Sequence, residues 1–208
     1  MTDLREQFGD IDIYLFDQLL RGRITPRMRI VDAGCGGGRN LVYFLRNGYD
    51  VAGCDRDAAA VETVRAMASR LAPALPADNF RVEPIESMSF PDASADVVLA
   101  SAVLHFATGD EQFQSMVENA WRVLKPGGIF FARLASSIGI EHQVQRIAGR
   151  RHRLPDGSER YLVDAALLTG LTARFGAELL DPIKTTVVQD QRAMTTWVIR
   201  KPESLLKK

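Results

Sequence analysis

Hydrophobic residues occur along the chain in two patterns, short continuous runs and longer stretches with helical spacing. Continuous apolar runs are typical of strands buried in a parallel sheet, and the clearest predicts a strand at 97–101. Shorter apolar stretches, some with polar residues between them, predict strands at 30–33, 49–55, 80–83 and 129–134. Helical spacing predicts helices at 41–46, 58–71, 111–123 and 161–175. Because strands and helices alternate, we expect βαβ units and therefore an α/β fold with helices packed on a mostly parallel sheet.

A further amphipathic helix is predicted before the first strand. Four apolar residues share one of its faces, namely Ile13, Phe16, Leu19 and Leu20. Asp10 or Asp12 is placed to cap its first turn, and Gly22 to end it. Tyr14 lies off the apolar face, so it either faces a substrate or is exposed on a helix that packs against the sheet. After the parallel strands, segments near 178–188 and 194–200 predict two more strands.

Charge and cysteine content narrow the classes of function. The 208 residues include 26 lysines and arginines and 26 aspartates and glutamates, which argues against broad nucleic-acid affinity and favours a small-molecule substrate. Cys35 and Cys54 are the only cysteines and no histidine cluster accompanies them, so neither a disulfide framework nor a metal site is predicted. Without a secretory leader or a long apolar run, a cytoplasmic location and no membrane partner are expected.

A glycine-rich turn joins the strand at 30–33 to the helix at 41–46. Residues 30–40 are Ile-Val-Asp-Ala-Gly-Cys-Gly-Gly-Gly-Arg-Asn, and such glycines let the backbone approach a ligand closely. The dinucleotide-binding pattern needs a third glycine where this chain has Arg39, and a phosphate-binding loop needs a Lys-Ser/Thr pair that is absent here. The alternative to a ligand site is a turn that only lets the strand and the helix pack.

Asp32, Gly34, Gly36 and Gly38 together resemble motif I of class I S-adenosylmethionine-dependent methyltransferases. The Leu-Lys-Pro-Gly-Gly sequence at 124–128 is similar to a second motif of this family, and the resemblance covers about residues 28 to 134. The small-molecule branches that the chain resembles are the ubiquinone-biosynthesis-like group and, at residues 38–40 and 47–51, the tellurite-resistance group.

The resemblance implies a fold and a domain organisation. The implied fold is a doubly wound, mostly parallel seven-stranded sheet of the Rossmann-like type with a closing antiparallel hairpin. A single methyltransferase domain is expected over residues 1–208. Its expected parts are an N-terminal helical segment (1–27), a cofactor-binding core (28–134), a cap insertion (135–160) and a C-terminal helix with the strand hairpin (161–208).

The implied cofactor is S-adenosyl-L-methionine, with binding residues at the ends of the first four strands. They are Asp32, Ala33, Gly34, Cys35, Gly36, Gly38, Arg39, Asp55, Arg56, Ile85, Glu86 and Ser101. Asp55 lies roughly 20 residues past the glycines, where such folds place a carboxylate that accepts from both ribose hydroxyls; an exposed strand-end aspartate is the alternative.

The family also implies individual roles for several of these residues. Asp32 is expected at the methionine amino group, Arg39 at its carboxylate, and Asp55 with Arg56 at the ribose and the adenine edge. The ubiquinone-biosynthesis-like branch commonly has an aspartate at the position of Pro84, so the two residues after this proline, at 85–86, are expected beside adenine.

The acceptor is the least defined part of the predicted function. Residues 101–106 resemble the motif IV region but lack the Asp/Asn-Pro-Pro-aromatic run of nucleic-acid amine methyltransferases, which disfavours nucleobases. His105 is the candidate catalytic residue, as a general base, with a packing role beside the cofactor as the alternative. In the cap, Arg146 and the basic run 150–153 either attract an anionic acceptor or form a solvated cationic helix face.

The predicted function is therefore in-line methyl transfer from S-adenosylmethionine to a small-molecule acceptor. A nucleotide-dependent oxidoreductase and a non-catalytic S-adenosylmethionine-binding protein are the alternatives. The sequence leaves open which atom is methylated, whether a general base is needed, and the oligomeric state.

Overall fold

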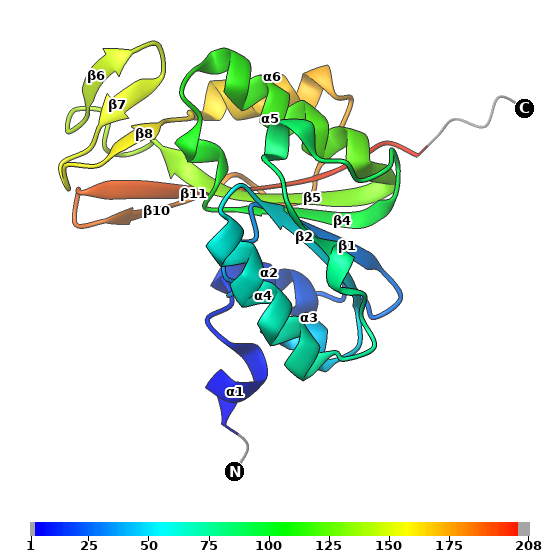
Figure 1. Cartoon of the computed structure of the whole chain (residues 1–208). Coiled ribbons are helices and arrows are strands. Elements are labelled where there is room, and N and C mark those ends of the chain that lie inside the picture. Colours follow the sequence, from blue (N-terminus) through cyan, green and yellow to red (C-terminus); the bar gives the residue numbers. More distant parts are fainter. Residues whose placement is uncertain (1–2, 204–208) are drawn as a thin grey trace, which may run out of the picture.

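A large mixed sheet organises the computed structural model, which describes residues 3–203 (Figure 1). Its parallel strands are β1 (Arg29–Ala33), β2 (Asp50–Asp55), β3 (Phe80–Val82), β4 (Ala95–Ser101) and β5 (Leu124–Ser136). Its antiparallel strands are β9 (Glu178–Leu179), β10 (Lys184–Val188) and β11 (Arg192–Arg200). The strand order is β10-β11-β5-β4-β1-β2-β3, with the short β9 paired to β11. The predicted doubly wound, mostly parallel sheet with a closing hairpin is confirmed.

Helices cover both faces of this sheet (Figure 1). One face carries α2 (Ile13–Leu20), α3 (Val42–Arg46) and α4 (Ala58–Leu71), and the other carries α5 (Asp110–Val123) and α6 (Ala165–Arg174). The short elements are α1 (Leu4–Phe8) and the 3₁₀ turns η1 (Ala77–Asn79), η2 (Ile85–Ser87) and η3 (Leu104–Phe106). The helix at 58–71 has the predicted bounds, and its apolar residues Val61, Val64 and Ala68 are buried. No helix within residues 3–203 has the length and apolar character that crossing a bilayer requires.

The N-terminal helix α2 buries a different face from the predicted one. Ile13 and Leu20, expected to face the sheet, are 67% and 71% exposed, whereas Leu15 is fully buried. Asp12 caps the helix, and its carboxylate also accepts a hydrogen bond of 2.6 Å from the guanidinium of Arg133 on β5. This ion pair fixes the start of α2, so the rotation of the helix depends on a polar contact that apolar spacing does not reveal.

Two element boundaries after the core differ from the prediction. The sequence at 124–128, predicted as a turn, forms the first residues of β5, where the pairing with β4 shifts register and Gly127 has a φ of 74°. The helix predicted at 161–175 begins only at Ala165. Asp164 caps it by accepting a backbone N–H, and before this residue Tyr161 ends a short strand and Val163 forms an isolated bridge with Ser136.

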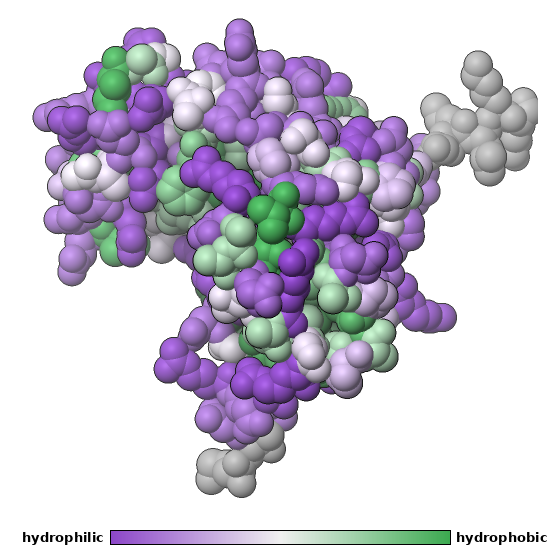
Figure 2. Space-filling view, in the orientation of Figure 1, coloured by the Kyte–Doolittle hydropathy of each residue, from purple (hydrophilic) through white to green (hydrophobic). Residues whose placement is uncertain are grey.

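The cap is a small antiparallel sheet, not a helix. Its strands are β6 (Gln145–Ala148), β7 (Arg151–Arg153) and β8 (Glu159–Tyr161). Arg150 pairs with Asp164 at 2.8 Å, and Arg151 and Arg153 both pair with Glu159, at 2.8 and 2.9 Å. The predicted cationic helix face is therefore wrong, and much of the basic charge is paired within the cap region. The surface of the cap is mostly hydrophilic in Figure 2.

Candidate functional site

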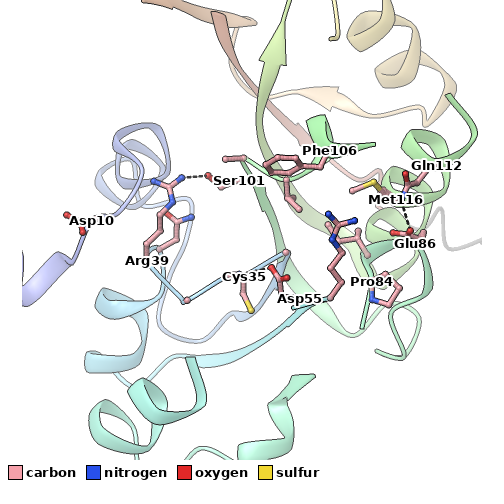
Figure 3. A pocket seen from close by; sticks show the side chains of 18 residues that line it. Asp10, Cys35, Arg39, Asp55, Pro84, Glu86, Ser101, Phe106, Gln112 and Met116 are labelled. Atoms are coloured by element: carbon pink, nitrogen blue, oxygen red, sulfur yellow. Dashed lines mark hydrogen bonds between the residues drawn. The ribbon is translucent and has the colours of Figure 1, made fainter. Parts of the chain in front are cut away.

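A cavity of about 630 Å³ lies at the carboxyl ends of β1, β2 and β4 (Figure 3). Neighbouring parallel strands end at one edge of a sheet, so the segments that follow them converge there. The cavity is lined by the glycine turn after β1, the end of β2, η2 after β3, the segment from the end of β4 into η3, and one side of α5. The larger sheet thus positions these five segments around one space, and Asp10 of the N-terminal segment lines it as well.

Most of the residues predicted to bind the cofactor line this cavity. They are Gly34, Cys35, Gly36, Arg39, Asp55, Arg56, Ile85, Glu86 and Ser101. Three others do not line it. Ala33 is fully buried in β1, Asp32 is buried at 2% exposure, and a Cβ at Gly38 would come within 2.7 Å of Val64 on α4. Ala33 and Gly38 thus support the turn without lining the cavity. Because Gly38 has no side chain, the turn packs closely on α4.

The glycine turn depends on an unusual backbone and on close packing. Gly34 and Gly36 have φ angles of 81° and 51°, which side chains other than glycine rarely adopt. A Cβ at Gly34 would overlap the side chain of Val103, which follows β4. The N–H of Gly36 donates to the carboxylate of Asp55 at 2.9 Å, so the end of β2 holds the turn in place.

Two backbone hydrogen bonds orient the carboxylate of Asp55 in the cavity wall. Its Oδ2 accepts from Gly36 and its Oδ1 accepts from the N–H of Asp57 at 3.0 Å. A carboxylate oxygen has two lone pairs, so each oxygen keeps capacity for one more donor. The side chain therefore offers two adjacent acceptors to hydroxyl groups of a ligand.

Asp32 places a buried carboxyl group close to the turn. Burial raises its pKa to about 7, while the positive charge of Arg39 lowers it and the negative charge of Asp55 raises it. No hydrogen bond within residues 3–203 adds to these effects. A cationic ligand group beside this carboxyl would favour the ionised form and lower the pKa again.

Different polar pairs mark two regions of the cavity wall (Figure 3). In one region the Arg39 guanidinium donates to the hydroxyl of Ser101 at 3.2 Å. In the other, Gln112 on α5 donates to the carboxylate of Glu86 at 2.7 Å, and the backbone carbonyl of Glu86 accepts from Asn119. The cavity therefore presents a cationic group in one region and a fixed carboxylate in the other.

Sequence reasoning did not assign half of the residues that line the cavity to the cofactor site. They are Asp10, Gly37, Asn40, Pro84, Ala102, Val103, Phe106, Gln112 and Met116. Gln112 and Met116 lie four residues apart on α5, a spacing that puts them on one face, but only the packing of α5 against η2 shows that this face reaches the cavity. Ala102 has a φ of 63°, and this strained turn directs the chain into η3.

His105, the predicted general base, does not line the cavity. Its Nδ1 accepts a hydrogen bond of 3.2 Å from the N–H of Ala135 on β5, so the neutral ring carries its proton on Nε2. Burial and then the charge of Arg160 lower its pKa to about 4. Neither ring nitrogen has a free lone pair at neutral pH, so this geometry supports the alternative of a packing role beside the site.

Comparison with known proteins adds a domain match and named relatives. Residues 31–132 match the family described as "Methyltransferase domain". An uncharacterised methyltransferase of Synechocystis sp. is 34% identical over 107 residues, 51% of this chain and 47% of that protein. A ubiquinone biosynthesis O-methyltransferase of Chelativorans sp. is 28% identical over 156 residues, 68% of this chain and 59% of that protein. The chain thus spans about half to three fifths of the length of these curated relatives.

A solved structure shares the fold. The 1,6-didemethyltoxoflavin-N1-methyltransferase of Burkholderia thailandensis, with bound 1,6-didemethyltoxoflavin and S-adenosylhomocysteine, superposes with a TM-score of 0.69 at 19% identity. The match covers 94% of this chain and 80% of that chain. At this level of identity the likeness establishes a shared Rossmann-like fold.

Proposed function

We propose that this chain, which carries the methyltransferase domain of the class I S-adenosylmethionine-dependent methyltransferases, transfers a methyl group from S-adenosylmethionine to a small-molecule acceptor. The observation that carries the proposal is the cavity where the glycine turn, Asp55 and the polar pairs of Arg39 and Glu86 meet at one sheet edge. The domain match and the relative named as a ubiquinone biosynthesis O-methyltransferase support the same reaction and cofactor.

The residues around the cavity suit the chemical groups of this cofactor. Asp55 accepts hydrogen bonds from the two ribose hydroxyls, because both of its oxygens keep free lone pairs. At the methionine end, Asp32 attracts the ammonium group and Arg39 binds the carboxylate. Ile85 supplies an apolar surface for adenine and Glu86 an acceptor for its amino group.

Methyl transfer in this site depends on positioning. When bound, the cofactor supplies a methyl group that its positively charged sulfur makes electrophilic. Ala102, Val103 and Phe106 form an apolar wall after β4, which excludes water and holds the acceptor. We propose that His105 supports this wall through its hydrogen bond to Ala135 and takes no proton from the acceptor.

Small molecules are the proposed partners, and nucleic acids are not. The balanced charge of the chain, with 26 basic and 26 acidic residues, provides no general attraction for a phosphate backbone. We retain the cytoplasm as the proposed location.

Calorimetric titration with S-adenosylmethionine, S-adenosylhomocysteine and NADH tests the cofactor assignment. We expect both sulfur nucleosides to bind and NADH not to bind. Asp55→Asn keeps one acceptor oxygen but removes the charge and the second acceptor, so we expect affinity for both nucleosides to fall about tenfold or more. Asp78→Asn is the matched control, because Asp78 is exposed and does not line the cavity.

Each other outcome contradicts a stated part of the proposal. Binding of NADH alone would contradict the methyltransferase assignment and favour a nucleotide-dependent oxidoreductase. Equal losses in Asp55→Asn and Asp78→Asn would show that Asp55 does not contact the nucleoside. Tight binding without transfer of a labelled methyl group to any member of a broad acceptor panel would favour a non-catalytic binding protein.

A further inference from the structure

Arg160 on β8 differs from its neighbours in the cap. Its guanidinium carbon lies 4.9 Å from the centre of the Phe106 ring, and it donates to the backbone carbonyl of Glu159 at 2.7 Å. Within residues 3–203 no carboxylate forms an ion pair with it, in contrast to Arg151 and Arg153, which share the carboxylate of Glu159. Arg160 therefore keeps hydrogen-bond donors and a positive charge for another group.

The position of Arg160 next to η3 is fixed by packing. The following residue, Tyr161, is buried, stacks on Phe113 of α5 with ring centres 4.5 Å apart, and donates to Asp110 at 2.7 Å. Phe106 lines the cavity and is 47% exposed. The guanidinium therefore stacks on a ring that also forms part of the proposed acceptor wall.

The carboxylates that line the cavity already have partners. Asp55 accepts from two backbone N–H groups, Glu86 accepts from Gln112, and Asp10 pairs with Arg5 at 3.0 Å. In the described part of the chain no carboxylate pairs with Arg39 or Arg56 on the cavity wall, or with Arg160 beside it. The donors to Asp55 and Glu86 are neutral groups, so both carboxylates keep their negative charge, but neither side chain belongs to the apolar wall of Ala102, Val103 and Phe106. At that wall the stacked guanidinium of Arg160 supplies a positive charge, and the sulfonium of the bound cofactor would supply another.

The acceptor wall offers no proton acceptor. Ala102, Val103 and Phe106 have apolar side chains, and the lone pair of His105 that could serve is used by the N–H of Ala135. An acceptor that must lose a proton, such as an alcohol, would find no base there. An acceptor that arrives as an anion needs none.

We propose that the methyl acceptor is a carboxylate attached to an apolar ring, with the ring against Phe106 and the carboxylate drawn toward Arg160. This inference rests on the proposed function. A lone pair of the carboxylate oxygen forms the new O–C bond while the S–C bond breaks, and its electron pair stays on sulfur. The products are a methyl ester and S-adenosylhomocysteine, and because the anion and the sulfonium neutralise each other, no proton is released.

Three probes of equal ring size test this charge preference by binding alone. The protein saturated with S-adenosylhomocysteine is titrated with 2-naphthoate, 2-naphthamide and 2-naphthylmethylamine at low ionic strength. We expect naphthoate to bind at least about tenfold more tightly than the amide, because it gains a charge-assisted contact, and the amine to bind most weakly. In Arg160→Met this preference should disappear while the affinity for S-adenosylhomocysteine stays unchanged.

Arg146→Met is the matched control, because it removes the same charge from the same small sheet. Arg146 donates to the carbonyl of Gly149 and lies on β6, which β7 separates from Arg160 on β8. We expect it to retain the naphthoate preference. Equal affinities for the three probes, no binding of any probe, or an equal loss in both variants would overturn the proposal.

A transfer assay separates this proposal from the proposed function. A panel of aryl carboxylates, phenols and amines is offered with labelled S-adenosylmethionine in weak buffer containing a pH indicator. We expect labelled ester from carboxylates without acid release. Transfer only to phenols or amines would overturn the carboxylate assignment but leave the methyltransferase intact, whereas failure of S-adenosylhomocysteine to bind would reject the proposed function itself.

Discussion

The buried carboxyl of Asp32 makes stability depend on pH. Its pKa is raised from 3.8 to about 7, so between these values the folded protein holds a proton that the unfolded chain has lost. The free energy of unfolding therefore falls as pH rises from about 4 to about 7, by up to roughly 4 kcal/mol, and is level on either side of this window. Asp32→Asn should match the wild type near pH 4 and exceed its stability near pH 8.

Urea unfolding across this pH range measures the difference in the free energy of unfolding between wild type and Asp32→Asn. The other titrating groups are the same in both proteins, so their contributions cancel in this difference. Saturating S-adenosylhomocysteine should reduce the difference, because its ammonium group favours the ionised carboxyl of Asp32. A constant difference between wild type and Asp32→Asn from pH 4 to pH 8 would show that this carboxyl does not titrate in the window.

Two substitutions separate the structural and catalytic roles of His105. In His105→Asn the amide oxygen still accepts from the N–H of Ala135, but the side chain is no base, so we expect turnover within about threefold of wild type. In His105→Leu the N–H of Ala135 loses its partner, at a cost of about 1–3 kcal/mol in the free energy of unfolding. Steady-state rates and thermal unfolding of both variants test this. If His105→Asn folds but its turnover falls about a hundredfold, His105 acts as a general base after all.

At the scale of single residues, the sequence predicts what lies near the glycine turn and misses what comes from elsewhere. Asp55 follows from its distance to the glycines, and the structure places it against the turn. Gln112 and Phe106 reach the cavity through the orientation of α5 and η3, which no local pattern encodes. His105 illustrates the converse, because its chemistry suits a base but a backbone N–H 30 residues away in sequence uses its lone pair.

The connection between β1 and α3 depends on the absence of a side chain at Gly34. Alanine there must adopt a φ of 81° and would overlap Val103, so we expect Gly34→Ala to lower the free energy of unfolding by about 2–4 kcal/mol. Displacement of the turn should also weaken S-adenosylhomocysteine binding about tenfold or more. Chemical unfolding and calorimetry measure the two effects.

Gly48→Ala provides the control for backbone strain alone. Gly48 has a similar φ of 70°, but open space surrounds the position of its missing Cβ. We expect a loss of about 1–2 kcal/mol and unchanged affinity for S-adenosylhomocysteine. Similar effects of both substitutions on binding would mean that contact with Val103 is unimportant for the shape of the turn.

At the scale of elements, periodic sequence predicts helices and strands in the core better than in the cap. The helix at 58–71 has a regular apolar side, and the side chain of Asp57 accepts a hydrogen bond from its first turn. Its bounds are predicted without error. In the cap, basic residues at 150–153 suggest a helix face, but β7 pairs with two neighbouring strands. These strands form local hairpins whose paired residues are 3 to 10 positions apart, but strands of three or four residues are too short to show a clear alternation of apolar and polar positions.

The N-terminal segment and the core of the molecule are joined through Asp12. Its backbone N–H donates to buried Asn40 beside the glycine turn at 2.9 Å, and its carboxylate pairs with Arg133, 121 residues later. Asp10, two residues earlier, lines the cavity. Asp12 thus connects the first turn of α2, the cavity wall and β5. The sequence predicts that Asp12 can cap the helix but not that it pairs with Arg133, because nothing local marks Arg133 as its partner.

Asp12→Asn should therefore release the N-terminal segment more than the rest of the fold. The amide retains the capping oxygen for α2, but the Arg133 guanidinium, partly buried, loses its counter-charge, at a cost of about 2–4 kcal/mol. We expect hydrogen exchange to accelerate first at amides of residues 9–20, while amides of α5 keep their protection, because the lost ion pair lies at the start of α2. S-adenosylhomocysteine should restore part of the protection, since Asp10 lies in the wall of its proposed site. Equal acceleration in α2 and α5 would instead mean that the segment unfolds only together with the whole molecule.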